Sequence, residues 1–294
     1  MHFRLSLALS AMVLAQTAPL AAKDPLVLAP SSKWNLDYAD EACRLGRSFG
    51  EGGNEVILVF AKYAPGPEME ILASGTGLTP DRARAFSYSF DPLEKTDVDR
   101  PLFGEMDTGG TIWQFNAGLI PSKSLETLAN GNATSAQVKA IETRFAEQTT
   151  GLTLNIGNKT PVTMRTGSLD KGLAAMDECL DNLVTSWGYD PAEIAEIVTW
   201  PEPVGRITSW FNYRDYPDEA LRKNLSGKVR FRLGIDETGA IETCTIQASY
   251  SDPSFAETVC NEFARKGKFT PATNADGEAV KSYWTNAVVF LSQP

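Results

Sequence analysis

Apolar and polar side chains alternate most regularly near the C-terminal end of the chain. In residues 227–235 one face is apolar and the other basic: Val229, Phe231, Leu233 and Ile235 against Lys228, Arg230 and Arg232. A side-chain period of two predicts a β-strand. Asp-Glu-Thr-Gly at 236–239 predicts a hairpin turn and residues 240–249 the returning strand. Ile241 is out of phase with the later apolar positions of that strand, which predicts a bulge or a late strand start.

Helical spacing and a last alternating segment complete this region. Asp252 is suited to cap a helix with Pro253 at its first position, and apolar residues in 255–263 share one helical face. Residues 279–292 alternate again, with apolar side chains in one phase. Together with a short helix near residues 218–224, the predicted order is helix, strand, strand, helix, strand.

The preceding region mixes strand and helix patterns. Three segments rich in β-branched and aromatic residues predict strands, the second returning antiparallel to the first: residues 55–63, 69–74 and 85–90. Apolar residues at helical spacing predict helices over 135–149 and 168–188. Ser168 is the expected N-cap of the second helix, and Gly188 stands where a helix commonly ends.

Prolines and a glycine interrupt the chain between residues 199 and 217. We therefore place a domain boundary there. The sequence predicts an α+β protein with a mixed α/β domain at residues 24–200, a linker at 201–213 and a small domain at 214–294.

The first 22 residues have the pattern of an export signal. A short basic lead, Met1 to Arg4, precedes an apolar run at residues 5–14, and small residues follow. We place cleavage after Ala22, with Ala15 as the second choice. The run is too short to span a bilayer comfortably, although its retention as an anchor stays open. The sequence therefore predicts an exported protein without an integral membrane span after cleavage.

The composition supports folded domains and disfavours nucleic acid as a partner. Hydrophobic residues make up 43 % of the chain, and the formal net charge is -10. About 270 residues beyond the leader are enough for two domains of ordinary size. An acidic chain is repelled by a phosphate backbone, so we expect no nucleic-acid partner.

Four cysteines fit an oxidising compartment. We expect pairing within each half, Cys43 with Cys179 and Cys244 with Cys260, although the crossed connectivities remain possible. The only histidine, His2, lies in the leader, and the cysteine spacings match no zinc pattern. We therefore expect no metal and no cofactor.

The last 80 or so residues resemble the C-terminal domain of TonB-family proteins. The resemblance rests on an ordered set of positions: Tyr216, Pro217, Ala220, Gly227, Val229, Phe231, Gly239, Phe269, Pro271, Ala272 and Gly277. It implies a three-stranded antiparallel sheet backed by helices. It also implies that a short peptide of an outer-membrane transporter adds as a strand to the sheet edge. The expected docking edge is residues 283–290, lined from one side by Tyr283, Thr285, Ala287 and Val289.

The leader and the resemblance together predict a periplasmic protein of a Gram-negative envelope. We expect its partner to be an envelope protein or a transporter peptide, with a possible link to outer-membrane transport. A TonB-type energy transducer carries a membrane helix and a long proline-rich spacer, whereas this chain follows its leader with a folded domain. Energy transduction is the alternative if the leader is retained.

Two short fragments resemble catalytic motifs. Asp107 stands in the Asp-Thr-Gly pattern of aspartic proteases, but no second copy accompanies it. Ser168 begins a Ser-x-x-Lys pattern without the companion motifs of penicillin-binding enzymes. We interpret the first as a turn and the second as a helix cap, and we expect no enzyme. The alternative is a histidine-free hydrolase in the N-terminal domain that uses carboxylates such as Asp107.

Overall fold

We describe a computed structural model of the chain, which covers residues 24–81, 85–106, 109–130, 133–250 and 252–292. Helices and strands are both abundant in it, and several separate sheets are present. The predicted α+β class is confirmed. The leader and its cleavage site lie outside the described residues.

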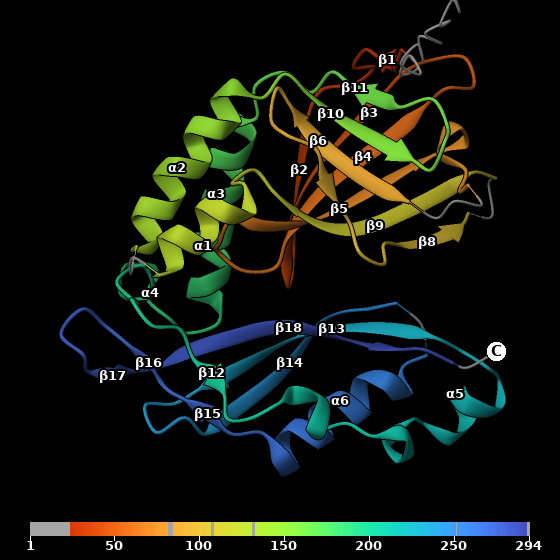
Figure 1. Cartoon of the computed structure of the whole chain (residues 1–294). Coiled ribbons are helices and arrows are strands. Elements are labelled where there is room, and N and C mark those ends of the chain that lie inside the picture. The colour runs from red at the N-terminus through yellow and green to blue at the C-terminus, as the bar shows by residue number, and fades with distance from the viewer. Residues whose placement is uncertain (1–23, 82–84, 107–108, 131–132, 251, 293–294) are drawn as a thin grey trace, which may run out of the picture.

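Two sheets form the body of the N-terminal region (Figure 1). A six-stranded antiparallel sheet has the order β2(Asn35–Ala39), β3(Ala42–Phe49), β4(Val56–Lys62), β5(Glu68–Gly75), β9(Thr111–Gly118) and β8(Leu102–Glu105). A five-stranded sheet has the order β1(Leu26–Leu28), β11(Val162–Met164), β10(Gly151–Ile156), β6(Phe86–Asp91) and β7(Thr96–Asp97), with β1 parallel to β11. A short 3-10 helix, η1(Thr76–Leu78), follows β5.

Aromatic side chains join these two sheets into one core. The ring of Phe86 stacks on that of Trp113 with centroids 4.6 Å apart, and Phe60 contacts Phe90 at 6.1 Å. The predicted strands at residues 55–63, 69–74 and 85–90 are confirmed as β4, β5 and β6, and β5 returns antiparallel to β4. Phe60 of β4, Ile71 of β5 and Phe86 of β6 are all buried in the core that the two sheets share.

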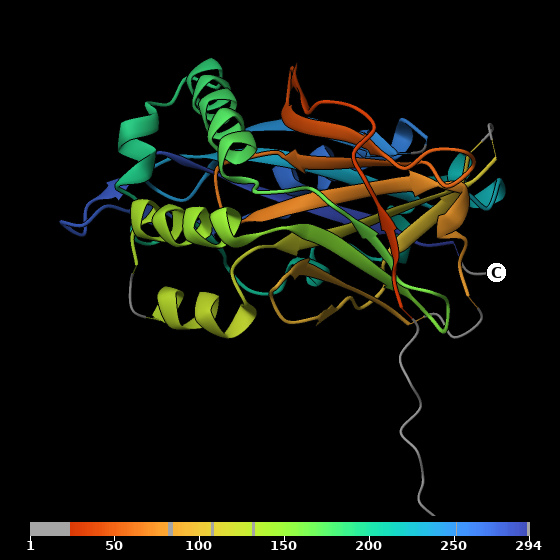
Figure 2. The same cartoon turned by 90° about the horizontal axis from the view of Figure 1, so that it is seen from above.

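Four helices gather at one end of the sheets (Figures 1 and 2): α1(Ser122–Asn130), α2(Ser135–Gln148), α3(Asp170–Ser186) and α4(Pro191–Ala195). Helices α2 and α3 confirm the two predicted helices. Thr134 and Gln137 form a capping box at the start of α2. The expected N-cap of α3 is wrong by one residue, because Leu169 holds that position and the Ser168 hydroxyl bonds the Asp170 carboxylate at 2.6 Å.

The C-terminal region forms a three-stranded antiparallel sheet in the order β14(Ile241–Tyr250), β13(Gly227–Ile235) and β18(Ser282–Phe290). Helix α5(Asp218–Arg222) precedes β13, and α6(Ser254–Lys266) connects β14 to the later strands. The predicted order of elements is confirmed. Three strand pieces of two residues each lie between α6 and β18: β15(Phe269–Thr270), β16(Ala272–Thr273) and β17(Ala279–Val280).

Two local expectations for this region have different outcomes. The bulge is present: the register of β14 against β13 shifts between Gly234 and Ile235, and a second shift lies between Arg230 and Phe231. The N-cap of α6 differs, since Pro253 rather than Asp252 holds that position. The Asp252 carboxylate still accepts the Ser254 backbone N–H at 3.0 Å, so its hydrogen bond serves the same helix start.

Both expected disulfides are present. Cys43 on β3 is bonded to Cys179 on α3, and Cys244 on β14 to Cys260 on α6. The first joins a sheet to the helical end of the N-terminal region, and the second fastens α6 to the three-stranded sheet. All four cysteines are thereby accounted for.

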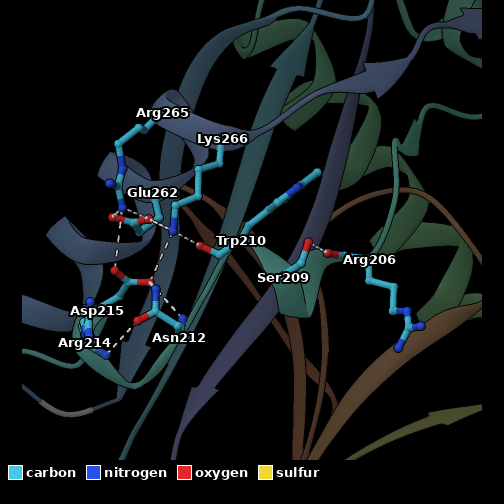
Figure 3. A network of polar contacts seen from close by, with 9 residues as sticks. All are labelled: Arg206, Ser209, Trp210, Asn212, Arg214, Asp215, Glu262, Arg265 and Lys266. Atoms are coloured by element: carbon cyan, nitrogen blue, oxygen red, sulfur yellow. Dashed lines mark hydrogen bonds and ion pairs between the residues drawn. The ribbon is translucent and has the colours of Figure 1, made fainter.

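The segment between the two regions is held against α6 (Figure 3). The Lys266 ammonium donates to the Trp210 carbonyl oxygen at 2.6 Å and forms ion pairs with Asp215 and Glu262 at 3.4 and 2.6 Å. The Trp210 ring packs edge-on against Phe263 at 5.8 Å. Residues 202–203, β12(Glu202–Pro203), also pair with β15. The predicted linker therefore packs against α6 and pairs with β15 over much of its length.

Candidate strand-binding edge and domain interface

The three-stranded sheet is covered on both faces. Helix α6 packs on one face, and the N-terminal region lies over the other (Figure 1). Phe231, Trp284 and Phe290 point toward α6 and form the core of the C-terminal region. With both faces occupied, the edges of the sheet are the places where another chain could pair with its backbone.

The two edges differ in regularity. No described strand pairs with the outer side of β18, and its nine residues pair with β13 without a register shift. The opposite edge strand, β14, carries two register shifts. Bulges twist an edge and interrupt its row of hydrogen-bonding groups, so they discourage strand addition. Strand β18 is therefore the edge better suited to accept a new strand.

Two hydrogen bonds indicate which backbone groups of β18 point outward. The Ala287 N–H donates to the Asn286 side-chain oxygen at 2.8 Å, whereas the Ser292 N–H donates to the Ser226 hydroxyl beside β13 at 3.1 Å. Successive residues of an antiparallel strand turn their N–H and C=O groups to opposite sides. The backbone groups of Tyr283, Thr285, Ala287 and Val289 are therefore directed away from β13.

The side chains of these four residues are exposed to very different degrees. Tyr283 is 2 % exposed, because its ring packs edge-on against Trp187, Tyr189 and Trp200 at 5.1–5.6 Å between centroids. Val289 is 46 % exposed. Thr285 and Ala287 are half-buried. Tyr283 can thus offer backbone groups to a partner, while its ring anchors the strand to the N-terminal region.

The basic face of β13 is buried against the N-terminal region rather than facing solvent. The Glu70 carboxylate on β5, whose side chain is 0 % exposed, is bonded by the Lys228 ammonium and by Arg230 Nη2, the latter at 3.0 Å. Glu70 also accepts from the Tyr63 hydroxyl at 3.2 Å, and the Arg230 guanidinium lies 4.4 Å from the centroid of the Tyr63 ring. One carboxylate therefore forms ion pairs with two cations between the regions.

The pKa shifts agree with this charge pairing. Burial acts to raise the pKa of the Glu70 carboxyl, but Arg230 and Lys228 outweigh burial and hold this pKa below its usual value. Burial lowers the pKa of the Lys228 ammonium, and the Glu70 charge offsets only part of that effect. Burial together with the Glu70 charge raises the pKa of Tyr63, so its hydroxyl remains a donor.

Two further contacts extend the interface along the sheet. Arg232 lies 3.6 Å from the Glu41 carboxylate and 4.2 Å from the centroid of the Trp187 ring. The Gln247 side chain donates to the Tyr63 carbonyl oxygen at 2.7 Å. The N-terminal region therefore contacts strands β13, β14 and β18, and it covers the face of the sheet while leaving the outer side of β18 unpaired.

The residues that carried the expected motif hold the small domain together. Tyr216 packs edge-on against Phe255 and Phe290, and its hydroxyl donates to the Leu225 carbonyl oxygen. Gly239 has φ +83°, and a Cβ there would lie 1.9 Å from the Phe269 carbonyl oxygen.

Residues 212–291 match the family "Gram-negative bacterial TonB protein C-terminal". The expected resemblance is confirmed.

The TonB-like domain is the part of the chain to which this match applies. No family matches the region before it, and no curated protein matches the chain. Among the described helices, none is long and apolar enough to cross a bilayer. The remaining motif positions Pro217, Gly227 and Pro271 lie at the start of α5, at the start of β13 and between β15 and β16.

Of the two fragments with a catalytic resemblance, only the one at Ser168 is described by the structure. Asp107 lies outside the described residues. Ser168 bonds Asp170 and the Ala146 carbonyl oxygen at 3.1 Å, which explains it as part of the start of α3. Within the described ranges, no group of three metal-ligating side chains comes together. The sequence did not lead us to expect the contacts of Glu70 across the interface. The one sequence feature that could have indicated them is a carboxylate within the otherwise apolar residues 69–74.

Proposed function

We propose that this chain is an exported envelope protein whose TonB-like domain captures an extended peptide segment of a partner as an added strand beside β18. The observation that carries the proposal is the regular, unpaired outer side of β18. Strand addition draws its affinity from main-chain hydrogen bonds, and alternate side chains supply specificity. The partner we propose is an envelope protein or a transporter peptide, as the family match suggests.

The number of outward backbone groups on β18 limits how many main-chain hydrogen bonds a partner strand can form, and so limits the binding free energy. A typical intramolecular hydrogen bond contributes about 0.5–1.5 kcal/mol. The groups of Thr285, Ala287 and Val289 lie along the open part of the edge, whereas Tyr283 lies where the edge enters the N-terminal region. Val289 is 46 % and Leu291 63 % exposed, so we expect the partner to place apolar side chains near this end.

The covalent structure supports export to the periplasm. Disulfides persist in oxidising compartments, and the described structure holds two of them. Each lies within one of the two regions. We therefore propose that residues 24–200 and 214–294 are separate domains. In this division residues 201–213 belong structurally with the TonB-like domain, because they pack on α6.

A proline substitution at the edge tests strand capture. Peptides that bind the purified protein are selected from a displayed random library, and their dissociation constants are measured by fluorescence anisotropy. Ala287→Pro removes an outward N–H that β13 does not use. We expect Ala287→Pro to weaken binding about tenfold, as expected for loss of one or two main-chain hydrogen bonds.

The matched control is Ala287→Val, which enlarges the side chain and keeps the N–H. We expect its affinity to stay within about twofold of the wild type. Equal affinities of Ala287→Pro and wild type would contradict strand addition at β18. Thermal unfolding of both variants shows whether the fold is retained.

A further inference from the structure

A cavity of about 840 Å³ lies among the four helices of the N-terminal domain. Its walls come from α1, α2, α3, α4, the turn between β4 and β5, and the segment leading to β12. Apolar side chains make up most of the lining, among them Leu125, Val138, Val184, Ile194 and Trp200. Ligand sites of proteins commonly enclose about 300–1,000 Å³ and are mostly apolar. Close-packed cores leave few voids larger than a water molecule, so this cavity exceeds a packing defect.

A buried ion pair forms one polar point of the cavity wall. Glu142 is 6 % exposed, and its Oε1 lies 2.9 Å from the Lys62 ammonium, which also donates to the Gly66 carbonyl oxygen at 2.9 Å. The other oxygen, Oε2, accepts no hydrogen bond from the residues that the structure describes. Because the Lys62 ammonium bonds only Oε1 of Glu142, the carboxylate retains in Oε2 an acceptor that a ligand donor could use.

The remaining charges of the wall are mostly acidic. Besides Glu142 they are Asp177, Asp181 and Glu202, against one base, Lys139. Lys139 pairs with Asp177 at 3.0 Å. Asp181 and Glu202 are exposed and form no ion pair within the described ranges of the chain. An apolar chamber with unmatched carboxylates favours an apolar molecule that carries a positive charge.

We propose that this cavity binds a small amphipathic cation: an apolar chain or ring system that ends in an ammonium or guanidinium group. The apolar body fills the space between α1 and α4, and the cationic group lies beside Asp181 and Glu202. Trp200 forms part of the wall and packs on Tyr283, so the site borders the beginning of β18. The proposal does not depend on strand capture.

Isothermal titration with three probes of equal alkyl chain tests this assignment. The probes are decyltrimethylammonium, decanoate and decanol, each used below its micelle concentration or solubility limit. We expect saturable binding of one decyltrimethylammonium per chain. We also expect decanol and decanoate to bind at least about tenfold more weakly, because neither carries a positive charge to pair with the carboxylates. Absence of saturable cation binding, or equal binding of decanoate or decanol, overturns the proposal.

Two pairs of variants locate the site. Ala136→Trp fills the cavity from α2, and we expect it to abolish cation binding. Ala140→Trp places the same side chain on an exposed position of that helix outside the cavity wall, and we expect unchanged binding. Unchanged binding in Ala136→Trp overturns the assignment to this cavity.

The second pair tests the charge. Asp181→Asn combined with Glu202→Gln leaves the apolar walls intact, and we expect about fivefold weaker cation binding. The control combines Glu147→Gln with Glu178→Gln, two exposed carboxylates of α2 and α3 outside the wall, and we expect no change. An equal loss of affinity in both double variants would show that only net charge matters and would overturn the proposed position of the cationic group.

Discussion

Replacing Glu70 by Gln is the sharpest test of how the N-terminal region and the three-stranded sheet are joined. The Glu70 side chain is 0 % exposed, and its two ion-pair partners, Lys228 and Arg230, are 11 % and 13 % exposed. Glutamine keeps the shape and one acceptor but leaves both cations without a carboxylate. Removing one partner of a buried ion pair costs about 3–5 kcal/mol. The residual solvent access of the cations reduces this, so we expect a loss of about 2–4 kcal/mol.

The assay is guanidinium-induced unfolding, followed by tryptophan fluorescence, since Trp187 and Trp200 lie at the interface. Glu68→Gln on the same strand is the control, because Glu68 is exposed, and we expect a change below about 0.5 kcal/mol. A loss below about 1 kcal/mol in Glu70→Gln would refute the view that this carboxylate holds the interface.

A triple substitution separates charge neutralisation from packing. Glu70→Met, Lys228→Met and Arg230→Met together remove all three charges and retain apolar bulk. Buried ion groups replaced jointly by apolar residues are often neutral for stability. We therefore expect the triple variant to be more stable than Glu70→Gln. A triple variant as unstable as the single one would show that hydrogen-bond geometry, rather than unbalanced charge, sets the cost.

Three further outcomes follow from the contacts described. Folding lowers the pKa of Glu70, so the ionised carboxylate stabilises the fold above the unfolded pKa of about 4.5. This stabilisation is lost as the pH falls through the lower folded pKa. The free energy of unfolding, measured as a function of pH in the acid range, should show the loss in the wild type but not in Glu70→Gln. Asn286→Ala removes the side-chain acceptor of the Ala287 N–H, so this N–H is free to bond a partner strand. Fluorescence anisotropy should then show up to about tenfold tighter binding of the library-selected peptides. Cys244→Ala with Cys260→Ala opens a short loop and should cost about 3 kcal/mol in denaturant unfolding.

The sequence predicts the TonB-like domain well because its information is local. Alternation in residues 227–235 identifies β13, and the phase error at Ile241 identifies the irregularity of β14. Spacing in residues 255–263 identifies α6. In each case the residues that specify an element are neighbours in the chain, and period-two or helical patterning is sufficient to assign it.

Long-range pairing could not be predicted in the same way. Strand β1 pairs with β11, more than a hundred residues later, and no local pattern indicates that partner. The period-two pattern also predicted that Lys228 and Arg230 share one face of the strand. It did not predict which residues cover that face. Glu70, the residue that covers them, lies on β5, more than 150 residues earlier in the chain. Its single carboxylate within an apolar strand is a weak signal before the fold is known.

Amide hydrogen exchange of β18 is the most direct test of strand capture, because it reads the backbone groups that an added strand would bond. In the free protein we expect Thr285 and Val289 to exchange faster than their neighbours Trp284 and Val288, whose N–H groups face β13. On binding of a library-selected peptide, we expect the Thr285, Ala287 and Val289 amides to become protected while those of β14 do not change. Protection that appears on β14, or none on β18, would contradict strand addition beside β18.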